Sequence, residues 1–147
     1  MFMSWLKYRL MLAKLQRKRR KVLSAYRNDY KEARTRGENG EKLDELMWVE
    51  RQEVGMIDDD VESVTTQFLL ETSRRLLLPI PEYQEEGGAW TRSSYTDELL
   101  LTRLAMVELR AAIREEKSAR REGAMTWMAA ATGIIGALTG LIAVWRN

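Results

Sequence analysis

The stretch from Ala124 to Trp145 constrains this chain most, because its 22 residues include no charged side chain while 31% of the whole sequence is charged. At about 1.5 Å per residue, a helix of this length spans roughly 33 Å, enough for a hydrocarbon core of about 30 Å. Trp127 and Trp145 lie near its two ends, where indole rings favour the water–lipid interface. The sequence therefore predicts a single C-terminal transmembrane helix over residues 124–145, with these two tryptophans as interface anchors.

The charges beside this segment predict its orientation. Positive residues concentrate on the cytoplasmic side of membrane helices. One cation, Arg146, follows the segment, and four precede it closely: Arg114, Lys117, Arg120 and Arg121. The first 15 residues do not resemble a signal peptide, since Lys7 and Arg9 interrupt their apolar run. We therefore expect a tail-anchored, single-pass membrane protein with a cytoplasmic N-terminus.

Charge is strongly segregated in the part of the chain before this segment. Residues 1–36 contain 12 Lys and Arg against 2 Asp and Glu, whereas residues 37–72 contain 2 against 11. Gly37 and Gly40 lie at the boundary, where glycine supplies the positive φ values of a tight reversal. We expect residues 1–78 to form an antiparallel helical hairpin, with helices over about 4–35 and 41–78.

The second of these helices has the clearest apolar periodicity. Residues with the three-four spacing of a coiled-coil seam are Val54, Ile57, Val61, Val64 and Phe68. Gly55 interrupts good helix formers and is expected to cost about 1 kcal/mol relative to alanine. Pro79 and Pro81 are expected to end the helix, because proline cannot continue it. The predicted fold is all-α, with coiled-coil character.

A register follows from the position of the reversal. If it is centred between Glu38 and Asn39, residue i lies opposite residue 77 − i, which brings a basic block beside an acidic one. The predicted electrostatic cluster consists of Arg17, Lys18, Arg19, Arg20, Lys21, Asp58, Asp59 and Asp60. It is interpreted first as charge matching within the hairpin. The alternative is that the basic block binds a partner, either lipid headgroups or nucleic acid.

A loop over 79–95 is predicted next, followed by a third helix and stalk over 96–123. Leu100, Leu104, Val107 and Ala111 are expected to form the inward stripe of this helix. In the loop, Tyr83 and Trp90 are candidates either for a partner contact or for covering the helical core. We expect the third helix to pack beside the first in a bundle that buries Trp5. The alternative places the N-terminal helix on the surface of an anionic membrane.

Small side chains gather on one face of the predicted transmembrane helix. Small-xxx-small spacing lets helix backbones approach closely in lipid. The positions expected to support helix–helix association are Ala129, Thr132, Gly133, Gly136, Thr139 and Gly140. A homo-oligomer or a membrane-complex subunit is therefore predicted.

No residue set predicts catalysis. Cysteine and histidine are absent, which excludes thiolate chemistry, imidazole acid–base chemistry and Cys/His zinc sites. No phosphate-binding loop or nucleophile elbow is present, and neither a metal nor a cofactor is expected. The leading hypothesis is a non-enzymatic scaffold or adaptor anchored in membrane lipid. A small pore-forming or transport-complex subunit is the alternative, and nucleic-acid binding is the weakest hypothesis.

Overall fold

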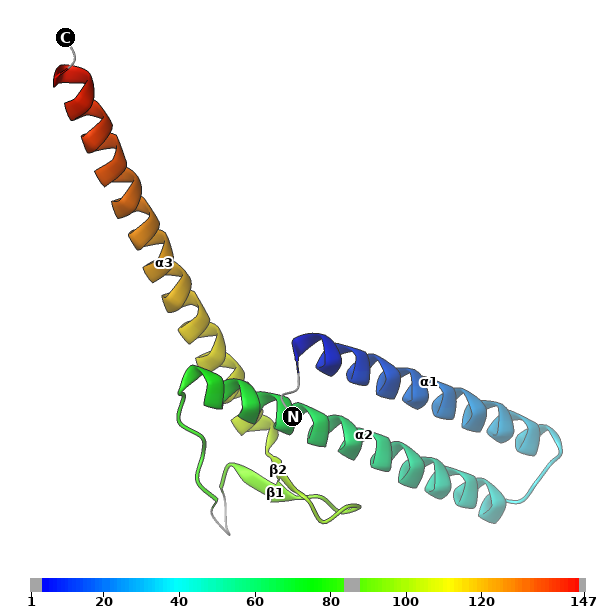
Figure 1. The fold of residues 1–147 in the computed structure, drawn as a ribbon. Helices are drawn as coiled ribbons and strands as arrows, with labels where there is room; N and C mark the ends of the chain where they lie inside the picture. The colour runs from blue at the N-terminus through cyan, green and yellow to red at the C-terminus, as the bar shows by residue number, and fades with distance from the viewer. Residues whose placement is uncertain (1–3, 84–87, 146–147) are drawn as a thin grey trace. The chain divides into compact units, whose positions relative to one another are not determined.

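The structure is a computed structural model that describes residues 4–83 and 88–145, with the side chains of the last helix described as far as residue 135. The chain is mostly helical, as predicted (Figure 1). Its elements are α1 (Trp5–Thr35), α2 (Gly40–Leu76), β1 (Trp90–Arg92), β2 (Leu99–Leu101) and α3 (Arg103–Trp145). They fall into two compact units, Met1–Leu109 and Arg110–Asn147.

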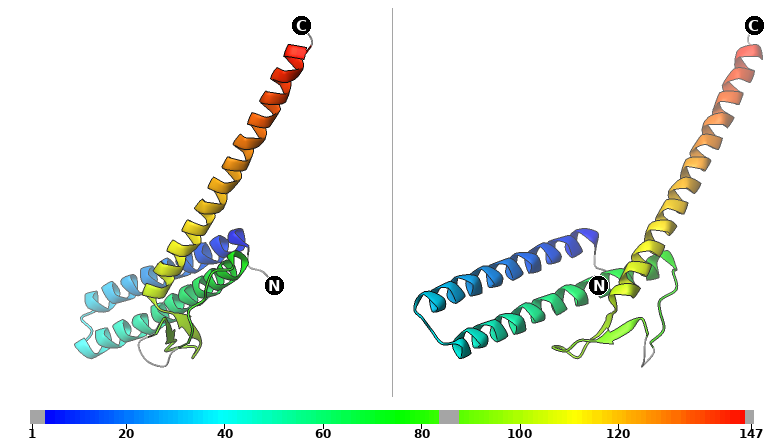
Figure 2. Two further views of the ribbon diagram at one scale, coloured as in Figure 1. Left: turned by 90° about the vertical axis from the view of Figure 1, so that its left-hand side faces the viewer. Right: turned by 180° about the vertical axis from the view of Figure 1, so that it is seen from behind.

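Helices α1 and α2 form an antiparallel hairpin, which the views in Figure 2 show side by side. Ser4 caps α1, and its hydroxyl accepts from the Lys7 amide at 3.2 Å. Gly37 makes the turn with φ of 71°, and Asn39 caps α2 by accepting from the Lys42 amide at 3.1 Å. A short polar side chain at each cap satisfies amides that a helix start leaves unpaired. The two helices agree with the predicted ranges to within two residues.

The end of α2 differs from the expected proline stop. The helix ends at Leu76, and Leu77 takes a left-handed conformation with φ of 61° and ψ of 30°. The Leu78 amide then donates to the Ser73 carbonyl oxygen at 2.9 Å, and the Leu77 amide to that of Arg74 at 3.2 Å. This is a Schellman turn, in which glycine is the usual left-handed residue.

Replacing Leu77 by glycine is expected to stabilise the protein by about 1 kcal/mol, because a Cβ is unfavourable in the left-handed region. The Leu77 side chain is 88% exposed, so its removal costs little packing. Urea unfolding followed by circular dichroism measures the change. Leu77→Ala is the control: it removes the same side chain but keeps the Cβ, and should leave stability nearly unchanged. Equal gains in both variants would contradict the backbone explanation.

Helix α2 carries two seams of buried and half-buried residues. The predicted apolar seam faces α1, and its members Ile57 and Val64 are 2% and 9% exposed. A second set also recurs every three or four residues, roughly 140° around an ideal helix from the first. This second seam consists of Gly55, Asp59, Glu62, Thr66, Leu69 and Ser73. It contacts the segment after α2, as described below, and places α2 at the centre of the Met1–Leu109 unit.

The predicted loop over 79–95 and the helix start at residue 96 were wrong in this segment. Strands β1 and β2 pair antiparallel, with Trp90 opposite Leu101 and Arg92 opposite Leu99. Asp97 has a positive φ of 56°, which no α-helix accommodates. Helix α3 begins only at Arg103, after Thr102, whose hydroxyl accepts from the Ala105 amide at 3.3 Å. Tertiary contacts with α2 therefore override the helical propensity of the leucine run.

The predicted inward stripe of the third helix was also wrong. Leu104 and Val107 are exposed, whereas Ala105, Met106 and Leu109 are buried. Leu100, which was assigned to the same stripe, is buried in β2 instead. Both stripes have helical spacing, so periodicity alone did not distinguish the buried face.

The predicted burial of Trp5 in a three-helix bundle is contradicted. Trp5 is 62% exposed, and its neighbours Leu6 and Leu10 are exposed to a similar extent. The reason lies in the second seam of α2. It receives the β-hairpin on a side of α2 turned away from the seam that α1 occupies, so the returning chain does not cover the first turns of α1.

Across the described residues, no helix combines the length and apolarity that crossing a membrane requires. The backbone of α3 is helical as far as Trp145. The predicted positions Gly136, Thr139, Gly140 and Trp145 lie outside the residues whose side chains the structure describes.

Candidate functional site: the cleft between α1 and α2

Two contacts fix the register of the α1–α2 hairpin. The rings of Tyr8 and Phe68 stack with centroids 4.0 Å apart and planes 3° from parallel. Farther along, Arg19 Nε lies 2.7 Å from Asp58 Oδ1, and Arg19 Nη2 donates to Asp58 Oδ2 at 3.3 Å. Asp58 is the residue that the 77 − i register places opposite Arg19. The hydrogen bond and charge of Asp58 raise the pKa of Arg19 above its ordinary value.

An open cleft of about 610 Å³ lies between these two contacts. Met11, Leu15 and Val64 provide apolar side chains in its lining. The same lining includes four cations, Lys14, Arg17, Lys18 and Lys21, and one carboxylate, Asp60. No ion pair joins these four cations to any acidic group in the described ranges 4–83 and 88–145. A cleft with apolar lining and several cations suits an anionic amphiphile better than a neutral or cationic ligand.

The structure divides the predicted electrostatic cluster among four environments. Arg19 and Asp58 pair across the hairpin, whereas Arg17, Lys18, Lys21 and Asp60 line the cleft. Arg20 is exposed, and Asp59 accepts a hydrogen bond from the Ser93 hydroxyl. Consecutive helical residues point about 100° apart, so the three adjacent charge pairs that the 77 − i register places opposite one another cannot all form. The basic block is therefore only partly used for pairing within the hairpin.

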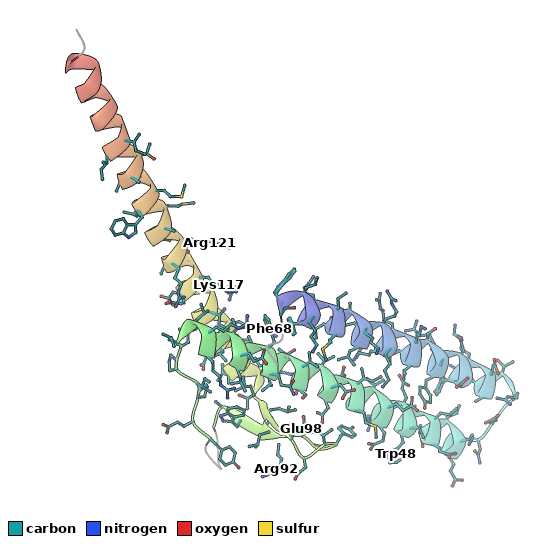
Figure 3. All side chains as sticks on the ribbon, in the orientation of Figure 1. Trp48, Phe68, Arg92, Glu98, Lys117 and Arg121 are labelled. Carbon is teal, nitrogen blue, oxygen red and sulfur yellow. The ribbon has the colours of Figure 1, made fainter. Side chains whose placement is uncertain are left out.

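The second seam of α2 holds the β-hairpin through polar contacts. The Leu101 amide donates to Thr66 Oγ1 at 3.1 Å, and Ser63, which lies beside the seam, donates from Oγ to Glu98 Oε2 at 2.9 Å. Figure 3 shows Glu98 beside α2 and Arg92 farther out on the hairpin. Glu62 lies 3.7 Å from the exposed Arg103. Sequence reasoning missed this seam, although its three-four spacing was present, because five of its six residues are small, polar or charged.

Ser93 organises the turn between β1 and β2. It is 6% exposed, and its hydroxyl oxygen accepts from the amides of Tyr95 at 3.1 Å and Thr96 at 2.9 Å. The same hydroxyl donates to Asp59 on α2. Arg92 Nη1 donates to Asp97 Oδ2 at 3.0 Å, and this contact, followed by one with Tyr83, raises the pKa of Arg92.

Gly55 allows the hairpin turn to approach α2 closely. A Cβ built on Gly55 would overlap the hydroxyl oxygen of Tyr95, so any larger residue forces Tyr95 to move. The glycine that the sequence marked only as a weak helix position is therefore a packing position for the aromatic ring.

The two aromatic candidates of the predicted loop have different environments. Trp90 is half-buried, and its indole Nε1 donates to the Pro81 carbonyl oxygen at 2.9 Å, which ties β1 to the segment after α2. Tyr83 is 52% exposed. Trp90 therefore has a structural contact, and Tyr83 remains accessible.

The Arg110–Asn147 unit contains the described part of the predicted association face. Ala129 is exposed, as is the predicted interface anchor Trp127, and Thr132 Oγ1 donates to the carbonyl oxygen of Met128 at 2.9 Å. A Cβ at Gly133 would meet nothing within 4 Å. These side chains lie on an uncovered helix surface.

In the part of the chain that the structure describes, no group of three or more Asp or Glu side chains is arranged to hold a metal ion. No protein-family model, curated protein or solved structure matches the chain.

Proposed function

We propose that this chain is a non-enzymatic, membrane-anchored helical adaptor, in which the segment after residue 123 holds the Met1–Leu109 unit at a membrane. The observation that carries the proposal is the exposed apolar surface of α3. Its large apolar side chains, each at least 63% exposed, are Met125, Trp127, Met128, Ile134 and Ile135. Several large apolar side chains exposed along one helix mark a surface that lipid or another protein covers.

The helix itself supports the same proposal. α3 continues without a break to Trp145, and residues 124–145 contain no charge. Before them, the surface is polar, and Arg120 pairs with Glu116 at 2.7 Å. The change from a charged stalk to an uncharged helix is expected where a chain enters lipid. Ala129, Thr132 and Gly133 present small side chains through which two such helices associate closely.

The anchor is tested by extracting membranes that carry the full chain with alkaline carbonate. We expect the protein to stay with the membrane pellet. Ile134→Arg combined with Ile135→Arg should release most of it, because each central arginine costs about 2.5–3.5 kcal/mol in the membrane. Glu115→Arg combined with Glu116→Arg adds at least as much positive charge in the stalk and should leave the protein in the pellet. Release of the unsubstituted chain would refute the anchor.

A further inference from the structure

One stripe along α1 is exposed over roughly four turns. Leu6, Leu10, Lys14, Arg17 and Lys21 are spaced by four, four, three and four residues, which places them within about 80° of one another on an ideal helix. All five side chains are exposed. We call them the α1 stripe: it is apolar at its N-terminal end and basic beyond Leu10.

The surroundings of the stripe are also basic. α1 contains no carboxylate before Asp29, and Lys18 lines the same cleft as Lys14, Arg17 and Lys21. At the apolar end, Trp5 is 62% exposed, and the guanidinium of Arg9 lies 5.7 Å from the centre of its ring. Asp60 is the one carboxylate that lines the cleft. The helix therefore presents a surface of aromatic, aliphatic and cationic side chains with few carboxylates beside them.

The order of these side chains selects among possible partners. Phosphate contacts from a nucleic acid would use Lys14, Arg17 and Lys21 but would leave Leu6 and Leu10 in water. An anionic bilayer satisfies both ends, because leucine and tryptophan enter the headgroup region while Lys and Arg contact lipid phosphates. Charge complementarity and exposed apolar surface thus point to the same partner.

We propose that the α1 stripe binds the surface of an anionic lipid bilayer, with Leu6 and Leu10 inserted among the headgroups and the three cations against phosphates. This contact is distinct from the anchor in α3 and does not depend on it. It would orient the Met1–Leu109 unit on membranes according to their charge, which a neutral hydrophobic anchor cannot do.

The test uses the absence of cysteine from the chain. Leu10→Cys in the full-length protein is labelled with an environment-sensitive fluorophore, and the protein is reconstituted into phosphatidylcholine vesicles with or without phosphatidylserine. We expect lipid-borne quenchers to quench the label at least about fivefold more on anionic vesicles, the factor that about one cation contributes. Raising the salt concentration should weaken this difference by screening.

Two controls isolate the stripe. A label at Trp48→Cys, an exposed position on α2, should show no dependence on lipid charge. Lys14→Gln, Arg17→Gln and Lys21→Gln together should abolish the difference at residue 10. A matched triple variant removes the same charge about 90° around α1 and should preserve the difference in quenching at residue 10. It combines Arg27→Gln, Lys31→Gln and Arg34→Gln.

Three results would overturn the proposal: equal quenching on neutral and anionic vesicles, no quenching on either, or a spectral shift that follows protein concentration without lipid. The last would assign the stripe to a second copy of the chain. Flotation of the same samples with neutral vesicles reports on the anchor separately. If the protein floats with neutral vesicles but its label is not quenched, the anchor is supported and the α1 stripe proposal fails. If the label is quenched only on anionic vesicles and the protein does not float with neutral ones, the α1 stripe proposal is supported and the anchor fails.

Discussion

Leu101→Ala is expected to destabilise the protein by about 2–4 kcal/mol, the usual cost of truncating a fully buried leucine. Leu101 is 0% exposed, and its amide donates to Thr66 Oγ1 on α2. Removing its side chain leaves a cavity where β2 packs on the second seam. Urea unfolding of the full chain in mild detergent, followed by circular dichroism, measures the loss as a lower midpoint.

Leu99→Ala is the matched control. Leu99 lies two residues earlier in the same strand and is 43% exposed, so its truncation should cost less than about 1 kcal/mol. Similar losses for the two variants would mean that β2 does not pack through Leu101. A small effect of both would contradict the docking of the β-hairpin on α2.

Ser93→Ala is expected to cost about 2–3 kcal/mol, because it removes one hydroxyl that serves several partners. The amides of Tyr95 and Thr96 lose their acceptor, and Asp59 loses a donor. A buried polar group left without a partner costs about 1–3 kcal/mol. The unfolding midpoint should fall, and exchange of the two amides with deuterated solvent should accelerate.

Ser94→Ala is the control for this loop, since Ser94 is the exposed neighbour of Ser93 and should be nearly neutral. A double-mutant cycle with Asp59→Ala tests the contact to α2. We expect the two substitutions to be non-additive, because each removes the same hydrogen bond. Additive effects would show that Ser93 stabilises only its own turn.

Much of the hairpin was readable from the sequence because its signals are local. Ser4 is a good cap, Gly37 supplies the positive φ of the turn, and the seam around Ile57 and Val64 has clear three-four spacing. The position of the reversal supplied the register, and the pairing of Arg19 with Asp58 lies at the position that this register gives. Local capping and periodicity need no knowledge of the rest of the chain.

The sequence pattern did not predict the polar contacts of α2 with the β-hairpin. The second seam of α2 includes Gly55, Asp59 and Thr66, which an apolar pattern passes over even though their spacing is helical. Each is explained only by a partner far along the chain: Tyr95 packs on Gly55, Ser93 donates to Asp59, and the Leu101 amide donates to Thr66. Hydrogen bonds and close approaches of this kind depend on which segments meet.

By itself the sequence determined the helical hairpin, its turn and the uncharged C-terminal segment, because each depends on neighbouring residues along the chain. The tertiary structure alone decided that Leu99–Leu101 is a strand, since the contact of β2 with Thr66 outweighs the helical propensity of three leucines. It also decided which side of α1 stays exposed. The β-hairpin occupies the second seam of α2, so Trp5, Leu6 and Leu10 are left uncovered.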